Sequence, residues 1–303
     1  RGLGDVYKRQ SYGQGRINPA YFYGIFDPND MRRDVSITMT GSNGKGVEKL
    51  IPFVPNSKAE GGGLTLNKWD ENRQANPWVA AQRKSGINGP YMRMSEVYLG
   101  YAEVCAALGD VVTGKQYLKT VRERSFPQGL ADTDGFIASF GNDLVRAIIE
   151  ERGFEYAGEG DRRWTLIRSG YLPEDIKRIK DMTKAMMDGL ATKGYYEFEN
   201  GNIISAYIWT KLVDAKTIYG HRLTAQCPMD KVNDPVLYPG WRGQKDNWEE
   251  MGLNYGNSAP ATNLAIKGLF EIVSEEEAAS LESQGYAKVN WGIDSVSYTH
   301  LRA

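Results

Sequence analysis

The sequence predicts a mainly α-helical protein in which helical hairpins carry long irregular loops and little β-structure. Three observations predict it. Residues 91–192 repeat apolar side chains at steps of three and four, the period of an amphipathic helix. Turn signals rich in glycine, proline and asparagine crowd residues 11–90. Residues 193–294 are irregular and rich in aromatic side chains, and we expect loops there.

The bulk composition excludes several classes of protein. With 303 residues, the chain can bury the core of one large domain or two smaller ones. The net charge of −1 gives no electrostatic argument for binding nucleic acid. No apolar run approaches the ~20 residues that a membrane-spanning helix needs.

Both ends of the chain resemble translated sequencing-adapter sequence: RGLGDVYKRQ at the start and SVSYTHLRA at the close. We therefore interpret residues 1–10 and 295–303 as artefacts and exclude them from the fold. The remaining residues 11–294 are expected to form part of one domain, without the natural N-terminus and any targeting signal on it.

Cysteine and histidine are too few for several chemistries. Cys105 lies in a helical run and is interpreted as a small buried apolar residue, whereas Cys227 lies in a polar loop without neighbouring ligand types. His221 is the one histidine outside the terminal artefacts, and it cannot build a catalytic triad or a metal site alone. We expect no metal, no cofactor and no catalytic residue of these kinds.

The first loop-rich segment contains one predicted strand, at residues 34–40, where apolar and polar side chains alternate. At the other end, a short helix is predicted at residues 275–284. Ser274 precedes it and Glu277 follows three residues later, which is a capping-box spacing.

Two consecutive helices are predicted at the start of the helical segment. The first ends at Gly109, and its expected buried stripe is Met94, Val97, Tyr98, Tyr101, Val104, Cys105 and Leu108. The second, at residues 112–124, is expected to bury Tyr117, Leu118 and Val121.

This pair resembles a tetratricopeptide hairpin. Gly114 stands where the second helix touches the first, and Leu118 and Val121 follow at the expected offsets. Ala102, twelve residues earlier, is the small residue that lets the helices approach, and Tyr98 lies four before it. One such repeat cannot bury its own faces, so further elements must pack on it.

Two more helices follow. One is capped near Asn142 or Asp143, with Leu144, Val145, Ile148 and Ile149 on one side. The other begins after Pro173, a residue that suits a first helical turn, and carries an apolar stripe interpreted as core: Ile176, Ile179, Met182, Met186, Met187 and Leu190.

The stretch EERGFEYAGEGDRRWTLIRSG combines acidic and basic residues in an unusual way. Glu151, Glu155 and Glu159 recur at spacing four, where like charges on a helix repel each other. The carboxylates could serve as catalytic acid and base, or arginines could bridge them in a structural network. Pairing of Arg152 with Glu155, and of Glu159 with Arg162 and Arg163, would lower the carboxylate pKa values and prevent acid catalysis. We therefore interpret the stretch as a structural ion network that also includes Arg168.

The stretches RMSEVYLGYAEVCAALGD, YLKTVRERSF and DLVRAIIEERGFEYAGEGDRRWTLIRSG, in this order, resemble the C-terminal half of SusD/RagB-like proteins, as does FDPNDMRRDVSIT before them. The family's recurrent block falls on Glu151, Arg152, Glu155, Glu159, Gly160, Arg162, Arg163, Leu166, Ile167, Arg168 and Gly170. The resemblance covers about residues 20–290. Two features depart from it: the family's usual Pro-Ile-Pro and Asn-Pro-Gly-Tyr ending is not visible, and the N-terminal half is absent.

The resemblance implies a SusD-like α scaffold and a binding function. Proteins of this family are nutrient-binding lipoproteins of the Bacteroidetes outer membrane, which act in polysaccharide utilisation. It implies capture of a glycan or other oligomeric nutrient without chemical turnover, and delivery to a SusC-type TonB-dependent transporter. It places the protein on the cell surface, held at the outer membrane by a lipid anchor that this chain lacks.

Sugars are held by aromatic rings that stack on their apolar faces and by polar side chains that fix their hydroxyl groups. Trp69 with Asp70, Asn72 and Arg73 forms one candidate platform, and Tyr21 and Tyr23 near Asp27 form another. We interpret Trp164 and Trp209 as core residues.

Two other classes stay open. A tetratricopeptide scaffold would bind peptides in a helical groove and would show further helix-pair repeats in place of the aromatic loops. An all-helical glycoside hydrolase would need two unpaired carboxylates in a cleft, roughly 5 to 9.5 Å apart.

Overall fold

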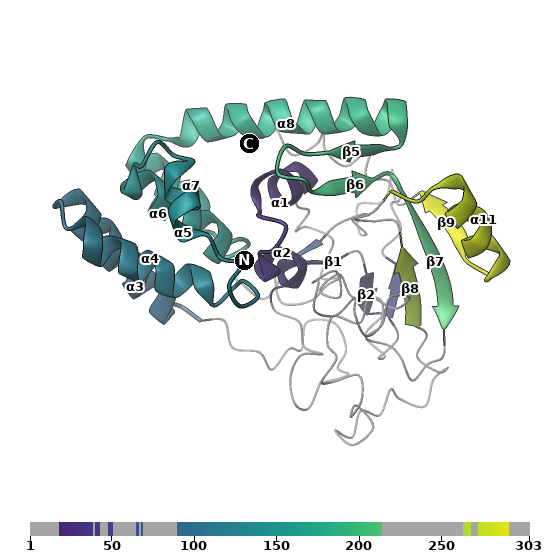
Figure 1. The fold of residues 1–303 in the computed structure, drawn as a ribbon, viewed down its shortest axis with the longest axis horizontal. Coiled ribbons are helices and arrows are strands. Elements are labelled where there is room, and N and C mark those ends of the chain that lie inside the picture. The colour runs from purple at the N-terminus through teal and green to yellow at the C-terminus, as the bar shows by residue number, and fades with distance from the viewer. Residues whose placement is uncertain are drawn as a thin grey trace, which may run out of the picture. The chain divides into compact units, whose positions relative to one another are not determined.

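The computed structural model describes residues 18–38, 40–42, 48–50, 65–66, 68, 90–213, 263–267 and 272–290 (Figure 1). The chain forms two compact units. The helical unit comprises Asn29–Arg32 and Asn88–Arg178, and the mixed unit comprises Arg1–Pro28, Arg33–Ile87 and Ile179–Ala303. The prediction of a mainly α-helical protein is confirmed.

The helical unit contains five complete helices and the start of a sixth, within the described residues. They are α3 (Met94–Ala107), α4 (Val111–Glu123), α5 (Thr133–Ala138), α6 (Leu144–Glu155), α7 (Asp161–Ser169) and the start of α8 (Leu172–Lys193). Aspartate side chains begin three of them by accepting a backbone N–H: Asp110 from Thr113, Asp132 from Gly135 and Asp143 from Arg146. The cap predicted near Asn142 or Asp143 is therefore Asp143.

The predicted close approach of the first two helices is confirmed. A Cβ atom added to Gly114 on α4 would lie 3.0 Å from the carbonyl oxygen of Ala102 on α3. That distance is tighter than nine in ten Cβ contacts in proteins, so glycine lets the two backbones meet without a shift. Leu99, Leu118 and Val121 fill the hairpin core, together with Ile148 of α6.

The stripe predicted for the first helix is buried only in part. Cys105 is buried as expected, and the ring of Tyr98 packs against that of Tyr117 with 5.5 Å between centroids. The other five positions of that stripe, namely Met94, Val97, Tyr101, Val104 and Leu108, are exposed. The buried face instead runs through Leu99 and Ala102, because α4 and α6 pack on that side.

The mixed unit joins two short N-terminal helices to small antiparallel sheets. The helices are α1 (Pro19–Ile25) and α2 (Met31–Ser36), of which α2 begins in the helical unit, and the rest of α8 belongs here. The strand pairs are β1 (Ile37–Thr38) with β4 (Thr65–Leu66), β2 (Thr40–Ser42) with β3 (Glu48–Leu50), and β5 (Tyr195–Glu197) with β6 (Ile203–Ser205). A three-stranded sheet has the order β8 (Asn263–Lys267), β7 (Tyr207–Val213), β9 (Ala287–Asn290), beside α11 (Glu275–Ser283).

Asparagine side chains fasten α1 to the β5–β6 hairpin. The amide nitrogens of Asn200 and Asn202 both donate to the carbonyl oxygens of Tyr23 and Phe26, at 2.7 to 2.9 Å. Arg33 in turn donates to the side-chain oxygen of Asn202. These bonds satisfy carbonyl groups at the C-terminal end of α1 that have no partner within the helix.

Two local predictions need correction. The segment predicted as one strand at residues 34–40 is a helix up to Ser36, and strand structure is limited to β1 (Ile37–Thr38) and to Thr40, the first residue of β2. The side chain of Asp30 accepts a hydrogen bond from the backbone N–H of Arg32 and so starts α2 just upstream.

The segment expected to be irregular after residue 193 contains the β5–β6 hairpin and β7. The helix near residues 275–284 is confirmed, and Ser274 caps it by accepting from Glu277.

Candidate functional site

Helix α6 buries charged side chains along most of its length. Glu150, Glu151 and Glu155 are each no more than 2% exposed. A carboxylate removed from water costs several kcal/mol unless it is paired and hydrogen-bonded. The arginines around α6 therefore determine what these carboxylates can do.

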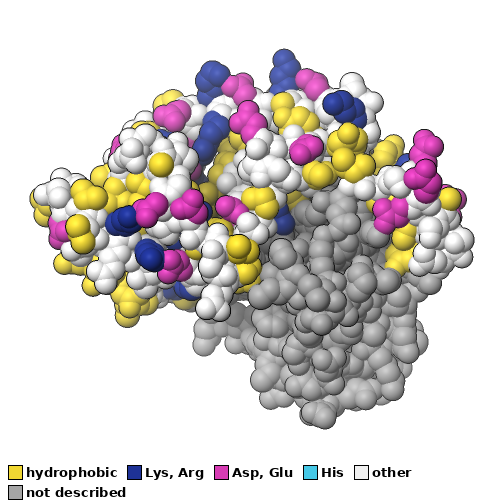
Figure 2. Space-filling model, in the orientation of Figure 1, with side chains coloured by type: hydrophobic (Ala, Val, Ile, Leu, Met, Phe, Trp, Pro, Cys, Tyr) yellow, Lys and Arg dark blue, Asp and Glu magenta, His cyan; other side chains and the backbone are white. Residues whose placement is uncertain are grey.

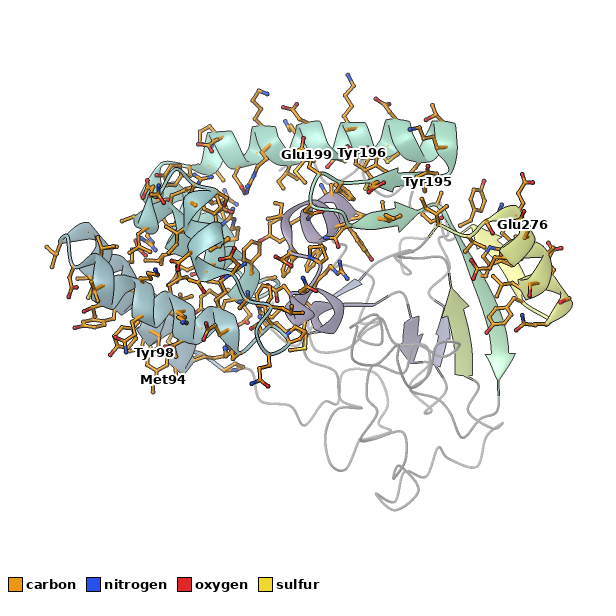
Figure 3. All side chains as sticks on the ribbon, viewed as in Figure 1. Met94, Tyr98, Tyr195, Tyr196, Glu199 and Glu276 are labelled. Carbon is orange, nitrogen blue, oxygen red and sulfur yellow. The ribbon has the colours of Figure 1, made fainter. Side chains whose placement is uncertain are left out.

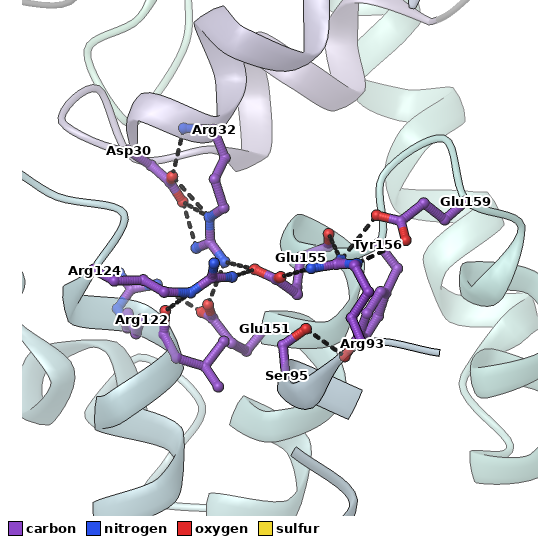
Figure 4. Close-up of polar contacts among 11 residues, drawn as sticks. Asp30, Arg32, Arg93, Ser95, Arg122, Arg124, Glu151, Glu155, Tyr156 and Glu159 are labelled. Carbon is purple, nitrogen blue, oxygen red and sulfur yellow. Dashed lines mark hydrogen bonds and ion pairs between the residues drawn. The ribbon is translucent and has the colours of Figure 1, made fainter. Parts of the chain in front are cut away.

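Four arginines surround two glutamates of α6 (Figure 4). Glu151 accepts from Arg32 at 2.6 Å and from Arg122 at 3.0 Å. Glu155 accepts from Arg93 at 2.6 Å and from Arg32 at 3.1 Å, and it also pairs with Arg124. Two further carboxylates complete the set, which we call the central cluster: Asp30, Arg32, Arg93, Arg122, Arg124, Glu151, Glu155 and Glu159.

The central cluster balances its charges. Asp30 pairs with Arg32 at 2.6 Å, and Glu159 pairs with Arg93 at 2.8 Å. Four carboxylates thus face four guanidinium groups. Because each acid has at least one cation in hydrogen-bonding contact, the cluster carries no net charge in the interior.

The electrostatics keep Glu155 ionised. Burial alone raises the pKa of this carboxyl group, but the positive charges of Arg32, Arg124 and Arg93 outweigh burial and lower the pKa from 4.5 to about 2. The neighbouring Tyr156 shows the opposite balance, because burial raises the pKa of its hydroxyl to about 12. Near neutral pH Glu155 is a permanent anion and Tyr156 a neutral hydrogen-bonding group.

Aromatic rings cover the guanidinium groups of the central cluster. The guanidinium carbon of Arg122 lies 3.9 Å from the ring centroid of Phe136, and that of Arg93 lies 5.0 Å from the centroid of Tyr156. Such cation–π contacts are stronger when water is excluded. The rings therefore both shield and orient the cations.

A second group of charges joins α6 to the start of α8. Glu150 binds Arg162 at 3.0 Å and Arg178 at 3.1 Å, and Asp175 binds Arg162 at 2.8 Å. Burial raises the pKa of Asp175, but the charges of Arg162 and Arg178 outweigh it and hold the pKa below its usual value. All of these residues belong to the helical unit.

The arginine partners predicted from local spacing are wrong. Arg152 binds Asp161 at 2.7 Å instead of Glu155. Glu159 binds Arg93, whereas Arg162 binds Glu150 and Asp175. The spacing argument assumed a continuous helix, but α6 ends at Glu155. Glycines with positive φ at 158 and 160 then turn the chain away.

The two remaining arginines of the predicted network differ from each other. Arg168 on α7 donates to Glu103 on α3, with one contact of 2.8 Å. Arg163 is exposed and forms no ion pair with the residues that the structure describes. It lies on the outer side of α7, so it is a solvated surface residue.

Sequence reasoning missed most partners of the central cluster: Asp30, Arg32, Arg93, Arg122 and Arg124. The sequence did contain a signal for these partners. Asp30 and Arg32 lie in FDPNDMRRDVSIT, Arg122 and Arg124 lie in YLKTVRERSF, and Arg93 begins RMSEVYLGYAEVCAALGD. These are among the stretches that carry the family resemblance.

The candidate ligand residues fall into two groups. Trp69, Asp70, Asn72 and Arg73 lie outside the described residues.

Tyr21 and Tyr23 are part of α1. Tyr21 is half-buried, with its ring edge-on to Phe22 and Phe26 at centroid distances of 5.4 and 6.0 Å. Tyr23 is fully buried, and the guanidinium carbon of Arg33 lies 5.7 Å from its ring centroid. A ligand role for Tyr23 would require α1 to move, and the role of both tyrosines stays a prediction.

The two tryptophans assigned to the core have different surroundings. Trp209 is buried against Leu281 and Tyr286, as predicted. The prediction for Trp164 is wrong, because its side chain is 69% exposed on α7. Thr165 and Leu166 occupy the inner face of that helix, which leaves no inward position for Trp164.

Other kinds of site find no support among the described residues. No group of three or more His, Cys, Asp or Glu side chains in those ranges is placed to hold a metal ion. No helix in the described part of the chain has the length and apolar character to cross a membrane. The buried carboxylates of both charge groups are each bound by arginine, which is the wrong arrangement for a pair of catalytic acids.

Comparison with known proteins agrees with the resemblance seen in the sequence. The family model described as "SusD family" matches residues 5–256. "SusD-like protein P25" of Formosa agariphila is 28% identical over 160 residues, which are 52% of this chain and 26% of that protein. The match thus spans about a quarter of the relative's length. No solved structure matches. Since the family match covers well over half of its residues, this chain belongs to the SusD family.

Proposed function

We propose that this protein captures a glycan or other oligomeric nutrient at the cell surface and passes it to a SusC-type TonB-dependent transporter. Membership of the SusD family supports a nutrient-capture role, since proteins of this family bind their ligands and are not enzymes. Delivery to the transporter and a lipid-anchored position at the outer membrane are parts of this proposal.

The observation that supports binding without turnover is that the carboxylates of the central cluster are paired with arginines. A general acid must hold its proton near the working pH. Glu155 has a pKa of about 2 and is bound by three arginines, so it cannot donate a proton at neutral pH. In this proposal the charged residues of the central cluster form a rigid frame.

The ligand would then be held by loops that project from the frame. Loops on a rigid scaffold are common sites of binding, because their sequences can change without loss of the core. We propose Trp69 as a stacking platform, with Asp70, Asn72 and Arg73 as partners for hydroxyl groups. Tyr21 and Tyr23 are the second candidate platform.

The proposal is tested by ligand binding in the protein expressed from its complete reading frame. A glycan array identifies a ligand, and isothermal titration calorimetry compares the wild type with Trp69→Ala and Arg73→Ala. We expect each variant to weaken binding by about 1 to 3 kcal/mol, the usual contribution of one stacked ring or charge-assisted bond.

Trp164→Ala is the control, because Trp164 is an exposed tryptophan on α7 to which the proposal assigns no role in binding. Its affinity should equal that of the wild type. A reducing-sugar assay on the bound polysaccharide is run in parallel. Release of new reducing ends would overturn the proposal of capture without turnover, and loss of binding in Trp164→Ala alone would move the site to α7.

A further inference from the structure

The turn of the β5–β6 hairpin contains a chemically reactive pair, Asn200–Gly201, directly after Glu199 (Figure 3). Asparagine deamidates fastest when glycine follows it, because no side chain then hinders the approach of the next backbone nitrogen. That nitrogen loses its proton and forms a bond to Cγ of the asparagine, while the bond from Cγ to Nδ2 breaks and ammonia leaves. A water molecule then opens the resulting succinimide ring to aspartate or isoaspartate.

Both polar atoms of the Asn200 side chain are held in place. Nδ2 donates to the carbonyl oxygen of Tyr23 at 2.9 Å and to that of Phe26 at 2.8 Å, at the C-terminal end of α1. Oδ1 accepts the backbone N–H of Asn202 at 3.0 Å, which closes an Asx turn. The amide cannot rotate toward the nitrogen of Gly201 without breaking these bonds.

The attacking atom is held as well. The backbone N–H of Gly201 donates to the carbonyl oxygen of Phe198 at 2.9 Å, so the proton that must leave is engaged in a hydrogen bond. Gly201 has a φ of +81°, in the left-handed region that glycine enters without strain. The turn thus fixes the nucleophile and its target separately, and neither is prepared for the reaction.

Close packing within the mixed unit opposes opening of this turn. Gly24 of α1 lies so near Met182 of α8 and Phe198 that an added Cβ atom would collide with both side chains. An added Cβ at Gly189 of α8 would likewise meet the ring of Tyr196 on β5. Figure 2 shows basic and acidic side chains along the upper edge, where α8 lies, so the other side of this helix is the one that packs on α1 and the hairpin.

Asn202 provides an internal comparison in the same turn. Its Nδ2 donates to the same two carbonyl oxygens, at 2.8 and 2.7 Å, and its side chain is buried. Ile203 follows it, however, and a β-branched side chain hinders attack by the backbone nitrogen. The two asparagines therefore perform the same structural task, but of the two Asn200 alone has a reactive neighbour.

We propose that Asn200 is a deamidation site that the folded protein keeps unreactive and that reacts once α1 separates from the β5–β6 hairpin. The product carries a carboxylate, whose oxygens can accept hydrogen bonds but not donate them. One oxygen would face the carbonyl oxygens of Tyr23 and Phe26, so the converted turn could not restore its bonds to α1. A single opening event would thereby leave a permanent chemical change in the chain. This inference does not depend on what the protein binds.

The test measures deamidation of the protein expressed from its complete reading frame, by peptide mass spectrometry, during incubation in mildly alkaline buffer with and without urea. We expect Asn200 to react at least ~10-fold more slowly without urea, because the turn must open first. Asn43–Gly44 and Asn88–Gly89 are the reference pairs in the same digest, and in urea they should react as fast as Asn200. Equal rates at Asn200 in both buffers would overturn the proposal, as would a stable Asn200 in urea where the reference pairs react.

Asn202→Ala tests whether the contact with α1 provides the protection, because it removes two bonds to α1 but leaves Asn200–Gly201 intact. We expect Asn200 to react about 10-fold faster in this variant than in the wild type, without urea. Thr192→Ala is the control, since Thr192 is exposed on α8 in the same unit and its hydroxyl donates to Asp188 of the same helix. An unchanged rate in Asn202→Ala would contradict the proposal, and the comparison in urea stands even where this variant does not fold.

Asn200→Asp carries the product of the reaction and tests its consequence. We expect amide hydrogen exchange in α1, measured by mass spectrometry, to be at least ~10-fold faster than in the wild type. Exchange at the wild-type rate would show that the conversion does not separate α1 from the hairpin.

Discussion

Glu155 is a buried side chain whose surroundings decide its chemistry. Its carboxylate has lost nearly all contact with water, which by itself favours the protonated form. Three guanidinium groups reverse that preference. The same contacts that keep the group charged also fix its position, so its role is to hold other residues in place.

The contribution of this residue to stability can be measured with Glu155→Gln. The change leaves Arg32, Arg93 and Arg124 without part of their compensating charge, and breaking such a buried pair costs about 3 to 5 kcal/mol. We expect urea unfolding to show that loss, with ligand affinity nearly unchanged. Glu103→Gln is the control, because Glu103 pairs with the half-exposed Arg168 and should cost less than ~1 kcal/mol. A selective loss of ligand binding in Glu155→Gln would contradict the structural role.

At the scale of elements, the sequence predicted helices best, because the apolar period and the capping residues of a helix can be recognised without knowledge of its neighbours. Periodicity predicted α3, α4, α6 and α8, and a capping signal predicted α11, because both signals lie within the helix's own stretch of sequence. The short strands β5 and β6 were not predicted. Three-residue strands have almost no periodic signal, and their stability comes from partners elsewhere in the chain.

The contact between α3 and α4 depends on Gly114, because glycine has no side chain to hold the two helices apart. In Gly114→Val the new Cβ would lie only 3.0 Å from the carbonyl oxygen of Ala102 and 3.1 Å from Leu144, so the surrounding helices must shift to accept it. Overpacking of this kind costs about 1 to 3 kcal/mol. We expect a corresponding fall in the free energy of unfolding in urea. Gln116→Ala, on the exposed side of α4, should change stability by less than ~0.5 kcal/mol. Equal stability of the two variants would show that the helices do not meet at Gly114.

At the scale of the whole chain, the central cluster joins segments that are remote in sequence. Arg32 and Glu151 are separated by 119 positions, yet their side chains are 2.6 Å apart. Local spacing could identify the acidic residues of α6 but could not identify these partners. The same limit applies to the proposed ligand platform of Trp69, Asp70, Asn72 and Arg73, for which the sequence supplied residue types without a position in space.

The pH dependence of unfolding follows from these pairings. The pKa of Glu155 is lowered on folding to about 2, and that of Asp175 is also lowered. Each therefore contributes stability that is fully present above the ordinary pKa of its carboxyl group, 4.5 for Glu155 and 3.8 for Asp175, and is lost as the pH falls through the lowered pKa of the folded protein. For Glu155 this amounts to about 3 kcal/mol. Urea unfolding between pH 6 and pH 2 should show the decline, and Glu155→Gln should show a shallower one. Stability that is flat over this range would contradict the pairing.

The central cluster also dictates an order of events during synthesis. The ribosome releases Arg32 first, then Arg93 and Arg122, while the acids that neutralise them at Glu151 and Glu155 emerge only later. Until α6 has left the exit tunnel, Arg32 has only Asp30 as a counterion, and Arg93 and Arg122 lack the glutamates that pair with them in the folded protein. The helical unit must therefore close late and as a whole, once its last acidic residues are available to every arginine together.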